Sequence, residues 1–315
     1  MRDIVDLLLL SVLWGAAYLF MRAAVPSFGA APLAAVRLGL AALLLLPLLA
    51  WRGGLGALRL NIRHWLVIGL PGTALPFLLL TQASLHITAG LVAVLNATAP
   101  LFSALFSHLA GRERLTSWRW AGLAVGIVGV ALLTAGNVSF KSVAGPLAVA
   151  AVLLCSVIWG LNANYARQHL PTMDALTMTV GSLSVAALGL APFAIATWPA
   201  EPPGLRAWAE VVFLGIGSSG LGMLMYFRLL RRIGAVRALA VTFLNPVVAT
   251  VAAAGYLGEN ITVQMVVGGG VVLLGTALSL GLIGPRPAPV ARPTGDGVTQ
   301  RTAPHDDGTD TAGRR

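Results

Sequence analysis

The chain has 315 residues, of which 57% are hydrophobic and 10% are charged, and this leaves too little polar surface for a water-soluble globule of its length. The net charge of +10 does not indicate a nucleic-acid partner, because the basic residues lie in short segments between apolar runs, where membrane topology explains them. The single cysteine, Cys155, excludes an intramolecular disulfide and a thiolate metal cluster. We therefore expect an integral membrane protein in contact with the lipid bilayer.

The apolar runs are continuous and of helical length, without the alternation of a barrel strand, so we expect an all-α integral membrane protein. The first window resembles a signal peptide, but its Trp-Gly pair recurs at 159–160, so we expect it to be retained. Windows of about 20 residues predict ten transmembrane helices, at 4–24, 31–50, 64–84, 89–110, 117–136, 144–166, 173–197, 207–230, 236–256 and 262–284.

The first two predicted helices carry aromatic residues and one arginine well inside the span. Trp14 and Tyr18 lie one helical turn apart, where aromatic rings can form an apolar wall for an organic substrate, or can serve packing or gating. A charge within the membrane is costly, so Arg37 is a candidate for recognising an anion or carboxylate. The alternative is a structural hydrogen-bond hub, with the side chain reaching outward.

Two predicted helices, 89–110 and 236–256, each combine polar residues with a proline. Asn96 precedes Pro100 in the first of them. Thr242 and Asn245 precede Pro246 in the second. A proline inside a helix frees the carbonyl four residues earlier, so both pairs concentrate polar atoms within the membrane. They predict two kinked helices that line a cavity near the middle of the membrane; the alternative is a kink that only improves packing.

Further candidates for substrate contact lie in three other predicted helices. Trp159, Asn162 and Tyr165 follow one another along the helix at 144–166, and packing or gating is the competing interpretation for Trp159. Phe77 in the helix at 64–84 and Tyr226 in the helix at 207–230 are weaker candidates.

The sequence contains one five-residue pattern twice. Two sets of five identical residue types are separated by 146 positions: Pro100, Glu113, Thr116, Gly122 and Gly129, then Pro246, Glu259, Thr262, Gly268 and Gly275. This agreement predicts a duplicated unit, with one five-helix repeat at 1–136 and a second at 144–284. We expect structural or gating roles for Pro100, Glu113, Pro246, Glu259, Gly122 and Gly268. The glycine-rich fifth and tenth helices could hold the halves together or form a homodimer.

The arginines and the lysine predict the orientation. With a cytoplasmic N-terminus, seventeen of them lie on the cytoplasmic side and three on the other, with Arg37 inside a span, which is the asymmetry of the positive-inside rule. Both termini are then cytoplasmic. Because five is an odd number, the second repeat enters the membrane from the opposite face, so the two five-helix repeats are inverted, an architecture that recurs in secondary transporters.

Several chemistries find no support in the sequence. No Asp or Glu lies in the middle of a predicted span, so a buried carboxylate for proton-coupled export of cations is not visible. No Walker lysine motif, zinc-binding helix pair or embedded Ser-His-Asp grouping occurs, so we expect neither an enzyme nor a cofactor or metal. The segment 285–315 is rich in Pro, Gly, Thr, Asp and Arg and is predicted to be a disordered cytoplasmic tail.

Ten spans, the duplication, the Trp-Gly pairs and the Pro-x12-Glu-x2-Thr-x5-Gly pattern together resemble the EamA-type families of the drug/metabolite transporter superfamily over about 280 residues. The resemblance implies a protein of the cytoplasmic (inner) membrane with a cavity for a small-molecule substrate between two bundles. One departure is that the second half has no counterpart of Arg37, since Ser182 falls near its place.

The leading hypothesis is a secondary carrier that exports a small organic solute, such as an amino acid, a metabolite or a drug-like molecule, by alternating access. Its predicted motion is a rocking of the first four helices against helices six to nine, with the fifth and tenth as supports. The alternatives are an uptake permease of the same superfamily, a membrane enzyme acting on lipid-linked substrates, and a non-transporting scaffold or sensor.

Overall fold

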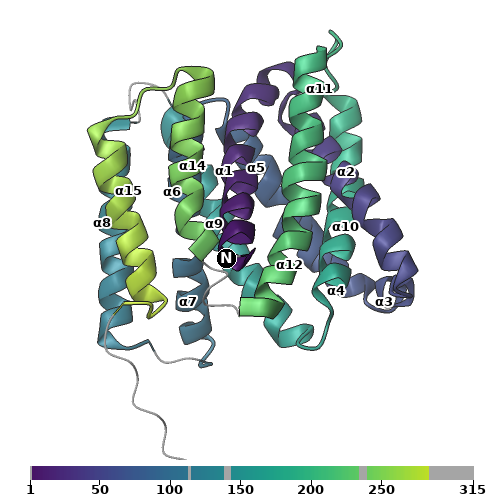
Figure 1. Ribbon diagram of the computed structural model, residues 1–315, viewed down its shortest axis with the longest axis horizontal. Helices are drawn as coiled ribbons and strands as arrows, with labels where there is room; N and C mark the ends of the chain where they lie inside the picture. The colour runs from purple at the N-terminus through teal and green to yellow at the C-terminus, as the bar shows by residue number, and fades with distance from the viewer. Residues whose placement is uncertain (1, 113–114, 138–142, 234–239, 284–315) are drawn as a thin grey trace, which may run out of the picture. The chain divides into compact units, whose positions relative to one another are not determined.

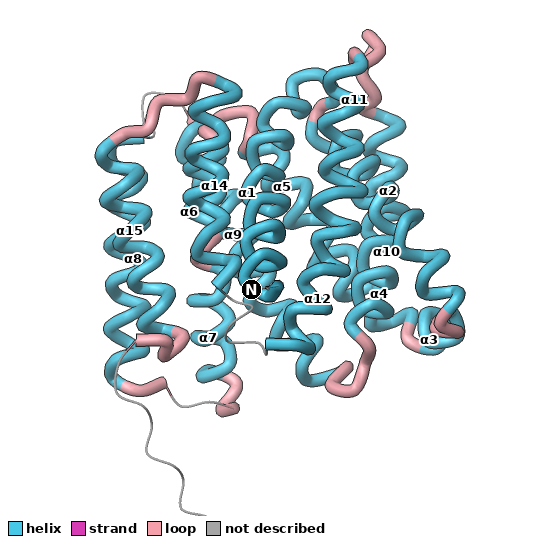
Figure 2. Tube along the Cα trace, in the orientation of Figure 1, coloured by secondary structure: helices cyan, strands magenta, loops and turns pink. Residues whose placement is uncertain are grey.

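The computed structural model describes residues 2–112, 115–137, 143–233 and 240–283, and within these ranges the chain forms helices and connecting loops without a strand (Figures 1 and 2). Glu113 and the predicted tail 285–315 lie outside the described residues. Eight of the described helices are long and apolar enough to cross a membrane, and two shorter apolar helices, Val241–Leu257 and Val263–Ser279, follow them. The all-helical membrane class is therefore confirmed, and each predicted window overlaps one of these helices.

Several spans are assembled from shorter helical pieces. One span consists of the pieces Ile62–Gly69, Leu70–Ala74 and Leu75–Ala83. Another begins with the pieces Leu205–Val212 and Phe213–Leu221. The helices in chain order are α1 (Arg2–Phe28), α2 (Ala30–Trp51), α3 (Leu55–Leu60), α4 (Ile62–Gly69), η1 (Leu70–Ala74), α5 (Leu75–Ala83), α6 (Ala89–Asn96), α7 (Ala99–Leu109), α8 (Ser117–Asn137), α9 (Ala144–His169), α10 (Ala175–Ala196), α11 (Leu205–Val212), η2 (Phe213–Leu221), α12 (Gly222–Ile233), α14 (Ala240–Leu257) and α15 (Val263–Ser279).

The helix containing Pro100 is broken rather than kinked. α6 ends at Asn96, and α7 restarts at Ala99 with Pro100 in its first turn, where a missing backbone donor is tolerated. The carbonyl of Ala97 in the break accepts a hydrogen bond from Thr276 Oγ1 at 3.3 Å, so a neighbouring helix satisfies it. α14, by contrast, continues through Pro246. The two prolines at matching positions therefore have different local consequences.

Two segments, η1 and η2, are π-helical. Both lie in the middle of a span, the first with a proline near its start and the second with three glycines. A π-helix shifts the backbone hydrogen bonds by one residue, and such segments are frequent at functional sites. Both segments reach the cavity described below.

The principal helix contacts join the first half of the chain to the second. α8 packs along α15, α2 along α10, and α1 along α14, while α9 packs against both α5 and α7. Figure 1 shows α8 and α15 side by side at the left of the view, with α2, α4 and α10 at the right and α1 between the two groups. The halves of the chain are thus interleaved, and the core is formed between them.

Glycines bring α8 and α15 into backbone contact. A Cβ atom on Gly268 would lie 2.7 Å from the backbone of Leu133, and one on Gly122 would overlap the backbone of Ser279. Only glycine allows so close an approach. Gly122 and Gly268 therefore lie in the contact between the two glycine-rich helices within the chain.

Substituting valine for Gly275 is expected to destabilise the protein by about 1–3 kcal/mol, because its Cβ would overlap the backbone of Gly126 in α8. Gly270 lies on the same helix, and a Cβ atom added there would have no neighbouring atom within 4 Å. Gly270→Val is therefore the matched control, with a change within about 0.5 kcal/mol. Thermal unfolding in detergent compares the two variants, and equal losses would contradict the assigned packing.

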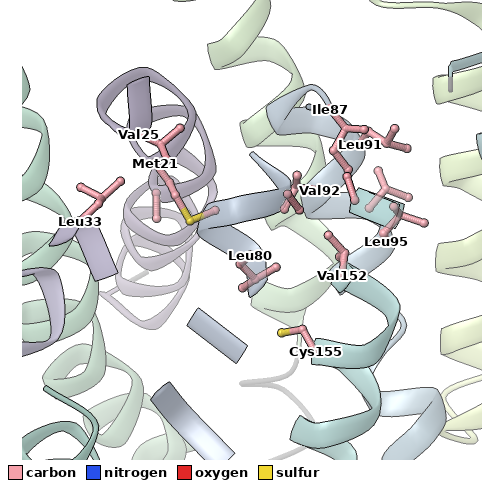
Figure 3. Close-up of a cluster of buried hydrophobic side chains, with 14 of the residues drawn as sticks. Met21, Val25, Leu33, Leu80, Ile87, Leu91, Val92, Leu95, Val152 and Cys155 are labelled. Carbon is pink, nitrogen blue, oxygen red and sulfur yellow. The ribbon is translucent and has the colours of Figure 1, made fainter. Parts of the chain in front are cut away.

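Apolar residues fill the bundle at one end. The cluster in Figure 3 combines the C-terminal half of α1, α6 and the N-terminal half of α9, with Val25, Leu91 and Val152 among its buried members. Cys155 lies at the edge of this cluster and is fully buried. We call this cluster the apolar seal, because its labelled members are apolar side chains and one cysteine.

Candidate functional site

A cavity of about 930 Å³ lies beyond the apolar seal and is lined by both halves of the chain. The lining comes from positions 159–167 near the C-terminal end of α9, 175–183 near the N-terminal end of α10, and 242 and 245 near the N-terminal end of α14. The seal uses the opposite end of α9, including Val152, and it meets the cavity at Met21 and Leu80, which belong to both. The cavity and the seal therefore occupy opposite ends of the bundle.

Most of the predicted substrate-contact residues line this one cavity. The lining includes Pro100 and ten of those candidates: Trp14, Tyr18, Arg37, Phe77, Asn96, Trp159, Asn162, Tyr226, Thr242 and Asn245. They come from helices far apart in the sequence, so the fold brings together residues that the sequence could only identify one by one.

Tyr165 does not line the cavity. Its hydroxyl lies 2.9 Å from His64 Nδ1, and its ring stacks on His169 with centroids 4.2 Å apart. The physical reason is helical geometry: residues three apart on an α-helix are rotated by about 60° relative to one another. The series Trp159, Asn162 and Tyr165 therefore turns away from the cavity, whereas Ala166 remains on the lining.

Asn96 connects three helices at the boundary between the cavity and the apolar seal. Its Nδ2 donates to the Tyr18 hydroxyl at 2.7 Å, and its Oδ1 accepts from Cys155 Sγ at 3.9 Å. Both ends of the amide are used, as a buried polar group requires. This small network ties α1, α6 and α9 together at the floor of the cavity.

Arg37 projects from α2 into the cavity wall and is 8% exposed. Its Nε donates to Ser219 Oγ at 2.9 Å, and its Nη2 donates to Ser218 Oγ at 3.5 Å. The guanidinium also lies over the Phe77 ring, 4.6 Å from its centroid. These contacts hold the arginine in one orientation between η2 and α5.

The two serines are functional candidates that reasoning from the sequence missed. They lie in η2, within a glycine-rich apolar stretch, and only the Ser-Ser pair itself could have drawn attention to them. A π-helical segment changes which backbone groups are free, and hydropathy does not reveal that change.

The carbonyls of both π-segments accept hydrogen bonds from cavity residues. Trp14 Nε1 donates to the carbonyl of Ser218 at 3.0 Å, and Asn162 Nδ2 donates to the carbonyl of Gly72 at 3.2 Å. Ser218 and Gly72 are 146 positions apart, the separation found in the repeated pattern. The central helices α1 and α9 are thus attached to η2 and η1 at matching points.

Aromatic rings form two pairs in the cavity wall. Trp14 and Tyr226 have ring centroids 5.2 Å apart, and Phe77 and Trp159 lie 5.9 Å apart in an edge-to-face arrangement. Such pairs offer flat apolar surfaces with polarised edges. They suit the apolar part of an organic molecule.

The charged residues that the structure describes in the cavity lining are all basic. Arg37, Arg119 and Arg167 contribute to the lining, which includes no Asp or Glu among the described residues. Arg167 Nη2 lies 3.2 Å from Ser103 Oγ and 3.3 Å from Asn164 Oδ1. Across the part of the chain that the structure describes, no group of three or more His, Cys, Asp or Glu side chains is placed to hold a metal ion.

Polar contacts lie at the sealed end of the bundle, around Glu259. Its carboxylate accepts from the backbone N–H of Ala89, with the two oxygens at 3.1 and 3.3 Å, and lies 3.6 Å from Arg22 Nε. Arg22 Nη1 also donates to the carbonyl of Ser84 at 2.5 Å. Burial raises the pKa of the Glu259 carboxyl, against the opposite effects of the Ala89 amide and Arg22. We call Arg22, Ala89 and Glu259 the end clamp.

Glu259 thus has a definite structural position, whereas Arg22 was not among the predicted site residues. A repeated spacing in the sequence points to Arg22. An arginine follows the tryptophan of each Trp-Gly pair by eight positions, Arg22 after Trp14 and Arg167 after Trp159.

Known proteins resemble this chain along most of its length. The sequence profile of the EamA-like transporter family matches residues 4–135 and 146–281. An Escherichia coli protein, "Uncharacterized inner membrane transporter YedA", is 30% identical over 261 residues, covering 80% of this chain and 82% of its own. A Streptantibioticus cattleyicolor protein named "Probable terminal-alkyne amino-acid exporter" is 29% identical over 277 residues, covering 86% and 91%. A solved crystal structure with 20% sequence identity superposes with a TM-score of 0.64 over 89% of this chain and 97% of that one, a likeness of fold.

Proposed function

Because this chain belongs to the EamA-like transporter family, we propose that it is a secondary transporter that exports a small organic solute by alternating access, without nucleotide hydrolysis. The observation that carries the proposal is the cavity of about 930 Å³, lined by both halves and separated from one end of the bundle by the apolar seal. A transporter needs a site that is reached from one side while the other side is closed. The relatives named as inner membrane transporters support a multi-pass protein of the inner membrane.

We propose that all ten helices cross the membrane as two inverted repeats, 1–136 and 144–284, with both termini in the cytoplasm. The distribution of basic residues supports this orientation. Helix packing supports the repeat: the contact of α1 with α14 has its counterpart in the contact of α9 with α7, and α2 packs along α10. A two-fold axis in the membrane plane would produce these pairs.

In this orientation the cavity is on the cytoplasmic side. α1 begins and α9 ends at the cytoplasm, and the lining residues lie in the middle of α1 and near the C-terminal end of α9. The apolar seal and the end clamp then close the external side. A state loaded from the cytoplasm is the starting point of an export cycle, and the exporter named among the relatives favours the same direction.

The interleaved packing favours moving parts that contain helices from both halves. α8 and α15 are joined along their glycine faces, whereas α2 and α10 pack along each other elsewhere in the bundle. α1 and α9 lie between these groups and are attached to η2 and η1 by Trp14 and Asn162. Opening the external side then requires separation of the end clamp and the apolar seal, with a compensating closure of the cavity.

Vesicle transport tests the proposed function. The full chain is reconstituted in proteoliposomes and screened with radiolabelled amino acids and other metabolites for counterflow, which requires no assumption about the driving gradient. Exchange of at least one solute above protein-free vesicles is expected. Inside-out and right-side-out membrane vesicles then distinguish export from uptake. Product formation without net movement would instead support a membrane enzyme.

A further inference from the structure

We propose that the cavity selects a solute with a carboxylate group and an apolar body, and that Arg37 binds the carboxylate. This inference rests on the proposed transport function and adds the chemical class of the solute. Arg37 is 8% exposed and lines the cavity. Within the described residues, no Asp or Glu oxygen lies within 4.0 Å of its guanidinium. A cation at this depth, without a protein counter-ion, is costly unless a ligand supplies the negative charge.

The contacts of Arg37 leave part of its donor set free. Nε and Nη2 are directed at Ser219 and Ser218, and the Phe77 ring covers one face of the guanidinium. Among the described residues, Nη1 has no hydrogen-bond partner. Serine hydroxyls orient an arginine but do not neutralise it. A guanidinium held in this way presents its remaining N–H groups to a planar carboxylate, the partner that its geometry matches best.

The surrounding charges favour an anion over a cation. Arg119 and Arg167 also line the cavity, and none of the described lining residues is acidic. Among the described lining residues an ammonium group would find no carboxylate to pair with, whereas a carboxylate would be attracted to Arg37 at low dielectric.

The asymmetry of the two halves also favours a ligand-binding role. A purely structural arginine in a duplicated fold would be expected in both copies, but Ser182 falls near the corresponding place in the second half and also lines the cavity. With a positive charge at Arg37 and only a small polar side chain at Ser182, a charged solute would bind in one orientation in the cavity.

The aromatic pairs define where the apolar body lies. Phe77 contacts both Arg37 and Trp159, so one wall passes directly from the cation to an apolar surface. Trp14 and Tyr226 provide a second apolar surface. A cavity of about 930 Å³ accommodates an organic acid of small-metabolite to drug-like size.

Binding of matched carboxylates and carboxamides to the purified full chain tests this inference. The probes are 3-phenylpropionate with 3-phenylpropionamide, and L-phenylalanine with L-phenylalaninamide, titrated by intrinsic tryptophan fluorescence. At least one carboxylate is expected to bind about tenfold or more tightly than its amide, because a charge-assisted hydrogen bond is lost in the amide. Arg37→Gln is expected to remove this preference, and Arg37→Lys to retain part of it.

Arg59→Gln is the control for loss of one positive charge, because Arg59 is exposed in α3 and lies outside the cavity lining. It is expected to bind all four probes as the wild type does. Equal binding of acids and amides, failure of both acids to bind, or an unchanged preference in Arg37→Gln would each overturn the carboxylate assignment. A merely structural loss in Arg37→Gln would weaken acids and amides alike, leaving their ratio unchanged.

The outcome is separable from that of the proposed function. Carboxylate binding without any solute flux in the vesicle screen would preserve the subsite and contradict transport. Flux restricted to neutral or cationic solutes would preserve transport and contradict the subsite.

Discussion

Replacing Asn96 by leucine is expected to lower the initial transport rate of the solute found by the counterflow screen about a hundredfold. The substitution removes the donor to the Tyr18 hydroxyl and the acceptor for Cys155, and leaves the hydroxyl partly buried without its partner. The floor of the cavity then loses the network that ties α1, α6 and α9 together. Transport is measured in proteoliposomes, with the amount of inserted protein and its unfolding temperature determined in parallel.

A double-mutant cycle separates this network from a general loss of packing. Tyr18→Phe removes the hydroxyl that Asn96 engages, so Asn96→Leu combined with Tyr18→Phe is expected to transport no more slowly than Asn96→Leu alone. If the fold-losses in transport rate of the two single variants multiply in the double variant, the two residues do not act through their contact. Wild-type rates in Asn96→Leu would show that transport does not need the network at the cavity floor.

Replacing Glu259 by alanine is expected to open the external end more often, raising the labelling rate of Cys155 by about tenfold. The change leaves the Ala89 N–H without its acceptor and removes the carboxylate beside Arg22, so the closed state is weakened relative to the open one. Cys155 is a suitable reporter because it is the single cysteine and is fully buried beside the apolar seal. A membrane-impermeant maleimide applied to intact cells measures the rate.

Glu259→Gln is the matched control, because its amide oxygen can still accept from Ala89. Labelling near the wild-type rate is expected in this variant, and equal rates in Glu259→Ala and wild type would contradict a clamp at this end.

The dependence of the labelling rate on pH tests the clamp in a second way, because its direction can be predicted. Burial raises the pKa of Glu259, so the closed form binds the proton more tightly than an open form with the carboxyl in water, and closure weakens as pH rises through the raised pKa. The ratio of wild-type to Glu259→Gln labelling is therefore expected to rise with pH.

The positions of the helices were predictable because hydropathy in a membrane depends on composition over a whole span. Each of the ten windows overlaps a helical span, and the break between α6 and α7 lies next to Pro100. The cavity was partly predictable for a related reason. Polar residues are costly inside a span unless they meet a partner, so Asn96 and Arg37 were informative from sequence alone. Trp159 was informative because its ring lies inside a span, away from the interfacial belt where tryptophan is common.

Contacts that depend on rotation around a helix or on local backbone form were not predictable. Tyr165 follows a three-residue spacing that drifts away from the cavity face and ends against His64. Ser218 and Ser219, which meet Arg37, lie in the π-helical segment η2, and a glycine-rich apolar run does not reveal that backbone form. The glycines of α8 and α15 had two possible roles, contact between the halves or a homodimer. That α8 and α15 pack against each other through these glycines could be seen only in the structure.

The proposed transport cycle depends on one cavity, built from both halves of the chain and reached from the cytoplasm. Sided labelling tests it most directly, with Ser103→Cys in α7 and Thr242→Cys in α14 introduced one at a time into a Cys155→Ser background. A membrane-impermeant maleimide is predicted to label both positions in inside-out vesicles and to leave both unlabelled in right-side-out vesicles. Labelling of the two positions from opposite faces, or of both from outside only, would contradict a shared cytoplasmic cavity.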